Sequence, residues 1–353
     1  MPRPIEGGFV TATSLDTADG GDDPTARDDD STLLETLLAR VRTVDLLVLF
    51  AVPVALLAVF AFPEATRRSL AFAYHDPTVR SAFTAHYVHL EADHLLANVF
   101  AYALLAGVGY LLAVAAGRRR FFFTAFATFC LAFPFALSAL NLAVPRRAIG
   151  FGFSGINMAF AGLLPLLLAV FVHTHLSGRG LASADLPPRS ETPDLPPRSE
   201  TPDRVPLSDS TAVRLLPATF LVVAGWIGTL ALPASTELPG LVGPGVLLGG
   251  VLLGALGVLS TPPARRPSLR DGLGRVVDRR GFGDLFVGGA VLAVAYPVVG
   301  FPAEPSVDGS VINLYVHLLG FCLGFIGPYT LLAVGVFDDR SPRPGGRSEP
   351  RTD

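Results

Sequence analysis

The sequence predicts an all-α protein that crosses a membrane as a polytopic bundle of about eight helices. Half of its 353 residues are hydrophobic, only 16% are charged, and the mean hydropathy is +0.50. This composition is too apolar for a soluble chain with one buried core. Two further observations, the length of the apolar runs and the placement of the arginines, support the same fold class.

Eight apolar runs follow one another along the chain, each close to the roughly 20 residues with which an α-helix spans a bilayer. They are 44–63, 92–115, 121–144, 154–175, 212–232, 240–259, 284–301 and 311–336. The sixth run is rich in Gly and the seventh is short. We therefore expect one membrane domain, 44–336, with about eight spans.

The placement of basic residues predicts the orientation of these spans. All 27 basic residues are Arg, and with the N-terminus inside, the outer connections hold only Arg67, Arg68, Arg80, Arg146 and Arg147. Cytoplasmic loops of membrane proteins carry the excess of basic residues. One span more or fewer would place a basic cluster outside, so we expect a multi-pass protein of the cell membrane with both termini in the cytoplasm.

Composition also suggests a source and limits the partners. The absence of Lys and the abundance of Ala, Gly, Leu, Val and Pro are typical of a GC-rich prokaryotic genome, and the aspartates near the N-terminus would fit a haloarchaeon. The formal net charge is only −3. We therefore expect no nucleic-acid partner.

Four polar segments flank or interrupt the membrane domain. Residues 1–35 lack the features of a signal peptide and are predicted to form a disordered cytoplasmic tail. Residues 177–211 contain the sequence Asp-Leu-Pro-Pro-Arg-Ser-Glu-Thr-Pro twice in tandem, which predicts a flexible cytoplasmic insertion. A basic loop is expected at 261–282 and a disordered C-terminal tail at 337–353.

The stretch from Gly150 to Gly162 places Ser154 between glycines at the head of an apolar run. Flanking glycines let another backbone or a substrate approach the hydroxyl, and the Ser154 amide could point at a bound oxygen. Ser154 is therefore a candidate nucleophile. Small residues also recur wherever membrane helices pack closely, so this stretch alone allows a purely structural interpretation.

A second polar stretch lies at the entry to the second span. His94 and Asn98 are four residues apart, so on a helix they share one face, and a polar pair inside a membrane is costly enough to suggest a function. Bonding to neighbouring helices is the structural alternative. For His89 we expect a role in holding the outer loop. Three nearby residues are interpreted as solvated loop residues: His75, His86 and Asp93.

The last span carries His317 near its outer end, with Gly320 and Gly324 on the same side of the helix. In the expected topology, Ser154 and His317 enter the membrane from the same side and at similar depth. A histidine within hydrogen-bonding reach of a serine can activate its hydroxyl. His94 and Asn98 enter from that side too, which makes them candidate donors to an oxyanion.

These three stretches, in this order, resemble the rhomboid family of intramembrane serine proteases. The matching positions are His89, His94 and Asn98, then Gly152, Ser154, Gly155 and Gly162, and finally His317, Gly320 and Gly324. The resemblance implies that Ser154 is the nucleophile, His317 the general base, and the oxyanion hole is made by His94, Asn98 and the Ser154 amide. It implies transmembrane substrates reached from membrane lipid, and neither metal nor cofactor.

The chain departs from the family pattern in ways that concern substrate access. Three predicted spans separate Ser154 from His317, where the family core has one. Met158 stands where some members have a Tyr that packs on the catalytic His, and Val316 stands where Ala is usual. Two alternatives remain: a rhomboid-like protein that binds membrane clients without cleaving them, and a transporter whose polar residues line a pathway.

Overall fold

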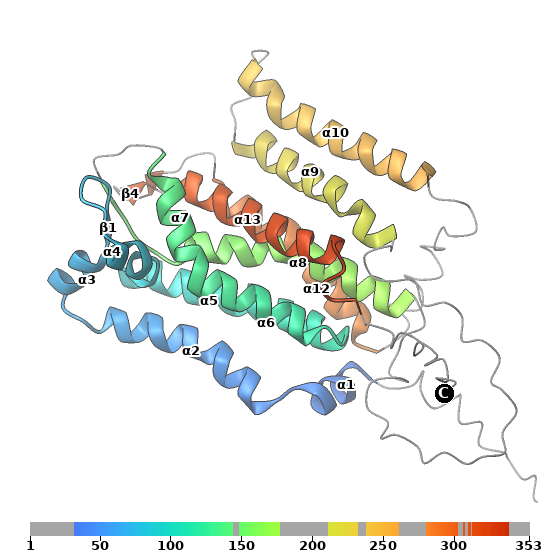
Figure 1. Ribbon diagram of the computed structural model, residues 1–353, viewed down its shortest axis with the longest axis horizontal. Coiled ribbons are helices and arrows are strands. Elements are labelled where there is room, and N and C mark those ends of the chain that lie inside the picture. Colours follow the sequence, from blue (N-terminus) through green and yellow to red (C-terminus); the bar gives the residue numbers. More distant parts are fainter. Residues whose placement is uncertain are drawn as a thin grey trace, which may run out of the picture.

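The protein is an all-α helix bundle (Figure 1). The computed structural model describes residues 32–143, 148–176, 211–231, 238–260, 280–302, 306–307, 310–311 and 313–338. The long helices are α2 (Thr43–Phe60), α5 (Ala92–Ala115), α8 (Ser154–Leu176), α9 (Thr211–Ala231), α10 (Leu238–Ser260), α12 (Phe282–Gly300) and α13 (Leu314–Ala333). Shorter helices are α1 (Leu33–Arg40), α3 (Glu64–Leu70), α4 (Val79–Thr84), the 3-10 turn η1 (Ala85–Tyr87), α6 (Arg119–Ala127) and α7 (Phe133–Asn141).

Within the described ranges, seven helical segments are long and apolar enough to cross a membrane. One of them, Arg119–Asn141, joins α6 to α7 through η2 (Thr128–Ala132), a π-helical turn that comes just before Pro134. Proline lacks the N–H that a regular α-helix would use here, which accounts for a local change of helical pitch. The helix α9 has 21 residues, with an apolar described part of Val213–Ile227, so a total of eight spans stays a prediction.

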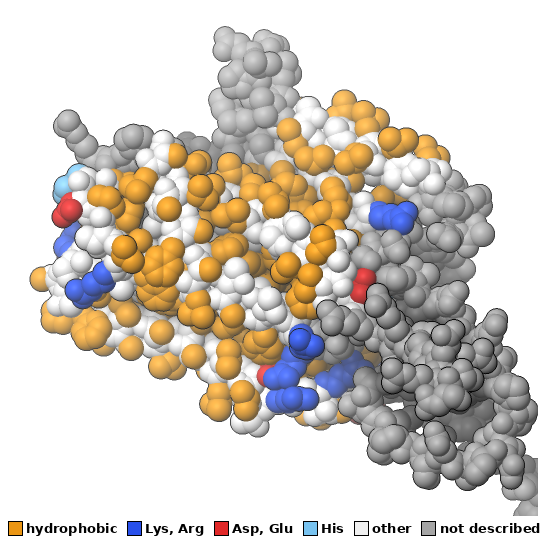
Figure 2. All heavy atoms as spheres, in the orientation of Figure 1, with side chains coloured by type: hydrophobic (Ala, Val, Ile, Leu, Met, Phe, Trp, Pro, Cys, Tyr) orange, Lys and Arg blue, Asp and Glu red, His pale blue; other side chains and the backbone are white. Residues whose placement is uncertain are grey.

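The helix α8 lies at the centre of the bundle, and 89% of its membrane-length segment is buried by α5, α9, α12 and α13. The helix α10 lies at the edge and packs on α9 (Figure 1). Exposed hydrophobic side chains cover much of the flank in the space-filling view (Figure 2). Such a surface suits lipid, because lipid tails solvate apolar side chains without penalty.

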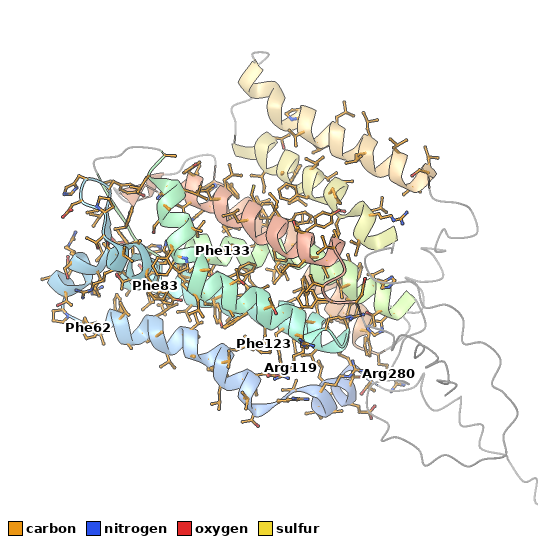
Figure 3. The ribbon with its side chains drawn as sticks, viewed as in Figure 1. Phe62, Phe83, Arg119, Phe123, Phe133 and Arg280 are labelled. Atoms are coloured by element: carbon orange, nitrogen blue, oxygen red, sulfur yellow. The ribbon has the colours of Figure 1, made fainter. Side chains whose placement is uncertain are left out.

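Two ends of the bundle differ in chemistry. At one, called here the arginine end, Arg119 forms a salt bridge with buried Asp45, and the Tyr110 hydroxyl donates to the same carboxylate at 2.8 Å. Figure 3 labels Arg119 beside Phe123, whose ring lies 5.4 Å from the guanidinium carbon. This cluster ties α2 to α5 and α6 with charge-assisted bonds, which are strong where water is scarce.

At the opposite end, called the site end, a short antiparallel pair joins β1 (Phe72–Ala73) to β2 (Ile149–Gly150). A second pair joins β3 (Ser306–Val307) to β4 (Ser310–Val311). The first pair connects the loop after α3 to the segment that leads into α8. It therefore limits how the chain can enter the helix that begins at Ser154.

The limits of the membrane domain differ slightly from those expected. The Thr32 side chain caps α1 and Thr32 N donates to the Glu35 carboxylate at 2.9 Å, so ordered helix begins within the segment predicted as tail. Phe337 packs edge-on against Phe121, so the domain continues to that residue. The rest of the predicted tails, insertion and basic loop lies outside the described residues, at 1–31, 177–210, 261–279 and 339–353.

Candidate functional site

A cavity of about 620 Å³ opens at the site end of the bundle. All four residues predicted for the site line it: His94, Asn98, Ser154 and His317. They come from three helices, α5, α8 and α13, and lie far apart in the sequence. The structure therefore brings together every predicted site residue in one space.

Ser154 is the first residue of α8 and is half-buried. The backbone bonds at this turn start with the amides of Ile156 and Asn157, which both donate to Phe153 O at 3.0 Å. The first N–H groups of a helix have no carbonyl within the helix to bond, and the helix dipole makes that end favourable for negative charge. The amides of Ser154 and Gly155, which precede these two donors, are therefore the ones placed to serve an anion beside the Ser154 hydroxyl.

Glycine is required at position 152 for two reasons. Its φ angle of +108° lies in a region that side-chain-bearing residues rarely adopt. A Cβ placed there would also approach His94 Cε1 to 2.8 Å. The Gly152 amide donates to Ala85 O at 3.0 Å. The chain therefore turns into α8 in close contact with the His94 ring.

His89 is fully buried and supports this turn from behind. Its Nε2 accepts a hydrogen bond from Phe153 N at 3.4 Å, and Arg67 donates to His89 O at 2.5 Å and to Leu90 O at 3.0 Å. Burial lowers the pKa of His89 to about 3, so the ring is neutral and can accept that bond. These contacts fit the loop-holding role expected for His89.

The Asn98 side chain is held by a residue that the sequence analysis did not single out. Asn98 Nδ2 donates to His94 O at 3.0 Å, and Asn157 Nδ2 donates to Asn98 Oδ1 at 3.1 Å and to Asn98 O at 3.0 Å. Asn157 is fully buried and lies one turn after Ser154 on α8. Because Asn157 occupies the Asn98 oxygen, the Asn98 side chain is held in one orientation, and its Nδ2, which donates one hydrogen to His94 O, keeps a second hydrogen for another acceptor.

His317 is buried, and its Nδ1 lies 2.6 Å from Gly300 O at the end of α12. A backbone carbonyl can only accept, so Nδ1 carries the proton and Nε2 of a neutral ring is left as the basic nitrogen. Met158 packs directly against Gly300, where a Cβ would collide with its methyl group. Met158 therefore contacts the residue whose carbonyl bonds to His317.

Glycines bring the Ser154 and His317 helices into backbone contact. A Cβ on Gly320 would collide with Gly155 O, and one on Gly324 would collide with Ala159 O. Within the described residues, Ser154 Oγ and His317 are nevertheless not hydrogen-bonded to each other. The hydrogen bond expected between the Ser154 hydroxyl and the His317 ring is therefore not formed in this structure.

A second serine–histidine contact lines the same cavity. His86 Nε2 lies 3.1 Å from Ser138 Oγ, and Ser138 Oγ donates to Ala82 O at 2.8 Å. The interpretation of His86 as a solvated loop residue is wrong, because its side chain is buried; His75 and Asp93 are exposed as expected. The burial of His86 depends on its contact with Ser138 on α7, 52 residues later, and sequence spacing does not reveal such a contact.

The mouth and far wall of the cavity add further polar groups. Asn313, which caps α13 through Val316 N, donates to Tyr74 OH at 3.2 Å and to Asn141 Oδ1 at 3.3 Å. Glu91 and Asp93 lie exposed at the rim. Tyr74, Asn141 and Asn313 were not singled out from the sequence, because they lie in three separate segments of the chain.

The cavity combines a hydroxyl at a helix N-terminus, an oriented imidazole and amide donors, which is the equipment for acyl transfer. Within the described residues, no group of three or more His, Cys, Asp or Glu side chains is arranged to hold a metal ion. Comparison of the chain with protein-family models, with curated proteins and with solved structures gives no match.

Proposed function

We propose that the chain is an intramembrane serine endopeptidase, similar to the rhomboid family, that cleaves transmembrane segments of other membrane proteins. The observation that carries this proposal is the convergence of Ser154, His317, His94 and Asn98 on one cavity inside a bundle of membrane-length helices. A peptide bond that enters from lipid could be hydrolysed there, because the cavity offers polar groups that the lipid does not.

The chemistry follows from the geometry of the two helices. His317 Nε2 takes the Ser154 proton as Oγ attacks the scissile carbonyl carbon, and the imidazolium then gives that proton to the departing amine. Gly300 O orients the ring through Nδ1. Water, activated by the same imidazole, then attacks the acyl ester and releases the second product. Substrate binding must bring Oγ and Nε2 together, as is common for sites that tighten only when occupied.

The developing oxyanion would bind the Ser154 amide together with Asn98 and His94. Asn98 lines the cavity, and Asn157 occupies its oxygen, so the second hydrogen of Asn98 Nδ2 is the group that would serve the oxyanion. His94 lies between Gly152 and the His89 ring, whose centroid is 4.9 Å away. These donors are fixed before substrate arrives, which is the condition for large electrostatic stabilisation.

Ser138 is a less suitable nucleophile than Ser154, although it contacts His86. Its hydroxyl already donates to Ala82 O, and its side chain is only 3% exposed. It also lies within α7, where helical bonding consumes the amides that an oxyanion would need. Ser138 therefore offers a matched control for Ser154.

Two other functions remain as alternatives. A non-proteolytic client-binding protein would use the same cavity without chemistry. A transporter would need polar groups along a pathway, but the predicted site residues His94, Asn98, Ser154 and His317 gather in one cavity at the site end. The transporter is therefore the weaker alternative.

The test uses purified protein reconstituted in vesicles with a model transmembrane substrate. A fluorophosphonate probe should label the parent and Ser138→Ala but not Ser154→Ala, and cleavage should fall to background in Ser154→Ala and in His317→Ala. The double variant should be scarcely worse than either single, since residues that act as one unit are not additive. Cleavage that persists in Ser154→Ala would refute the assignment. Substrate binding without cleavage by the parent would favour the client-binding alternative.

We also propose that the site end faces outward and both termini face the cytoplasm of a prokaryotic cell. The excess of Arg on the predicted inner connections supports this orientation. The check is maleimide labelling of intact cells, in a background where Cys130 and Cys322 are replaced by Ala. Ser69→Cys should react with a membrane-impermeant reagent and Ser208→Cys should not. The reverse pattern would overturn the topology.

A further inference from the structure

A second cavity, of about 270 Å³, lies between α6–η2 and α13, away from the site cavity. Its floor is formed by buried side chains that include Phe121 and Phe129, and its rim by the exposed residues Thr124, Thr128 and Gly327. We call it the α6–α13 groove. It opens on the flank of the bundle, where exposed hydrophobic side chains indicate contact with lipid.

The walls of the groove suit hydrocarbon. Thr124 Oγ1 donates to Arg120 O at 2.9 Å and Thr128 Oγ1 donates to Thr124 O at 2.8 Å, so both hydroxyls are satisfied within their own helix. Gly327 leaves the space open, since a Cβ at that position would have no atom within 4 Å. The neighbouring Gly324 differs, because α8 covers it. An apolar chain could therefore enter the groove without leaving a buried polar group unpaired.

One end of the groove is basic. Arg118 Nη1 donates to Phe337 O at 2.8 Å, and Phe337 lines the groove. Arg120 lies one turn before Thr124 on the same helix face, is exposed, and forms no ion pair with another described residue. Two acidic groups at the arginine end are already engaged, Asp45 with Arg119 and Asp338 with a partner of its own. Arginine side chains gather at this end of the molecule (Figure 2).

We propose that the α6–α13 groove binds one acyl chain of an anionic glycerophospholipid whose phosphate contacts Arg120. The dimensions agree: Arg120 and Phe129 are nine helical residues apart, or about 14 Å along the axis, which is close to one leaflet of the hydrocarbon core. The charge at the groove end selects an anionic headgroup over a zwitterionic one. This inference does not depend on the proposed protease function.

The test is a lipid titration of the purified full-length protein followed by native mass spectrometry. Phosphatidylglycerol and phosphatidylcholine with identical acyl chains are the two probes. Gly327→Leu fills the groove and should reduce binding of both lipids. Arg120→Gln should weaken phosphatidylglycerol binding about fivefold and phosphatidylcholine binding by less, because the choline ammonium offsets the phosphate charge of the second lipid.

Two matched variants control for side effects. Gly288 on α12 is also a helical glycine with no atom within 4 Å of an added Cβ, so Gly288→Leu adds the same bulk on another exposed face. Arg80→Gln removes an exposed arginine at the site end. Both should bind both lipids like the parent. Unchanged binding in Gly327→Leu would overturn the proposal, as would equal loss of both lipids in Arg120→Gln. A Gly327→Leu variant that only dissociates a dimer would identify a second copy of the chain as the occupant and would overturn it too.

Discussion

The helices α8 and α10 have the same length and are both strongly apolar, yet they occupy opposite positions in the fold. Each has 23 residues and an internal proline, with two glycines in α8 and seven in α10. Of the membrane-length segment of α8, 89% is buried, whereas the corresponding figure for α10 is 11% (Figure 1). Hydropathy therefore identifies both as membrane helices but does not reveal which one forms the centre of the bundle.

The two helices differ in what their glycines contact and in whether they carry polar side chains. On α8, Gly162 faces the backbone of α13. On α10, Gly250 packs on α9 but Gly245 and Gly249 face open space. The segment 243–259 of α10 has no polar side chain at all, while α8 carries Ser154 and Asn157 at one end. The combination of polar residues with a glycine that contacts a neighbouring backbone thus distinguishes α8, the buried helix that carries site residues.

The largest expected effect on stability comes from adding a methyl group to a glycine that contacts a neighbouring backbone, compared with a glycine that faces open space. Gly324→Ala should destabilise the protein by about 3 kcal/mol or more, because the Cβ would collide with Ala159 O and the two backbones cannot separate locally. Gly249→Ala, with no atom within 4 Å, should be neutral or stabilising by up to about 1 kcal/mol. Thermal unfolding in one detergent measures both. Equal effects would mean that α8 and α13 do not pack as described.

The second effect is on activity and separates a positioning residue from a structural one. Asn157→Ala should lower kcat roughly 10-fold with little change in KM, because Asn98 then loses the donor that orients it as an oxyanion ligand. In the Asn98→Ala background the same change should cost almost nothing further. Full additivity of the two losses would show that Asn157 acts through folding alone. Circular dichroism of each variant checks the fold.

Much of the fold could be predicted because length and apolarity identify membrane helices in a sequence. The predicted run 92–115 is α5 to the residue, and 154–175 falls one residue short of the end of α8. The short helices of the loop before α5 could not be predicted in this way. Their positions depend on capping and on contacts such as Thr84 Oγ1 to Leu70 O, not on hydropathy.

The candidate site was predictable in so far as its residues share a depth in the membrane. Ser154 and His317 were paired because parallel entry of their helices places them at one level, and both line the cavity. Gly300 could not be found, because its contact joins the end of α12 to His317 on α13, 17 residues later in the sequence, and no periodicity connects the two. Ser138 lies 52 residues from His86, and no periodicity connects them.

The third effect is a pH dependence of stability that belongs to the site end alone. Burial lowers the pKa of His86 to about 4 and that of His89 to about 3, so the unfolded chain, with ordinary histidines near 6.5, binds more protons at mildly acidic pH. The associated stability is fully present above pH 6.5 and is lost as the pH falls from there toward 4. Each histidine adds a slope of up to about 1.4 kcal/mol per pH unit.

Thermal unfolding between pH 7.5 and 4.5 measures this slope, and His86→Gln should reduce it by up to about 1.4 kcal/mol per pH unit. His75→Gln is the matched control, since His75 is exposed in the same region. An identical slope in the parent and in His86→Gln would contradict the burial of His86.

The smallest effect tests whether the α9–α10 pair supports the helix that carries His317. Phe220 on α9 stacks on Phe325 of α13 at 4.5 Å and on Phe321 at 5.8 Å. Because lipid would replace the lost apolar contacts, Phe220→Ala should cost only the aromatic pairing, about 0.5 to 1.5 kcal/mol. Leu248→Ala on α10, where Leu248 is 57% exposed, should be close to neutral. If Phe220→Ala also lowers kcat while Leu248→Ala does not, the α9 contact helps to hold His317 in place. If both variants behave like the parent, the pair is a peripheral addition to a bundle whose site is complete without it.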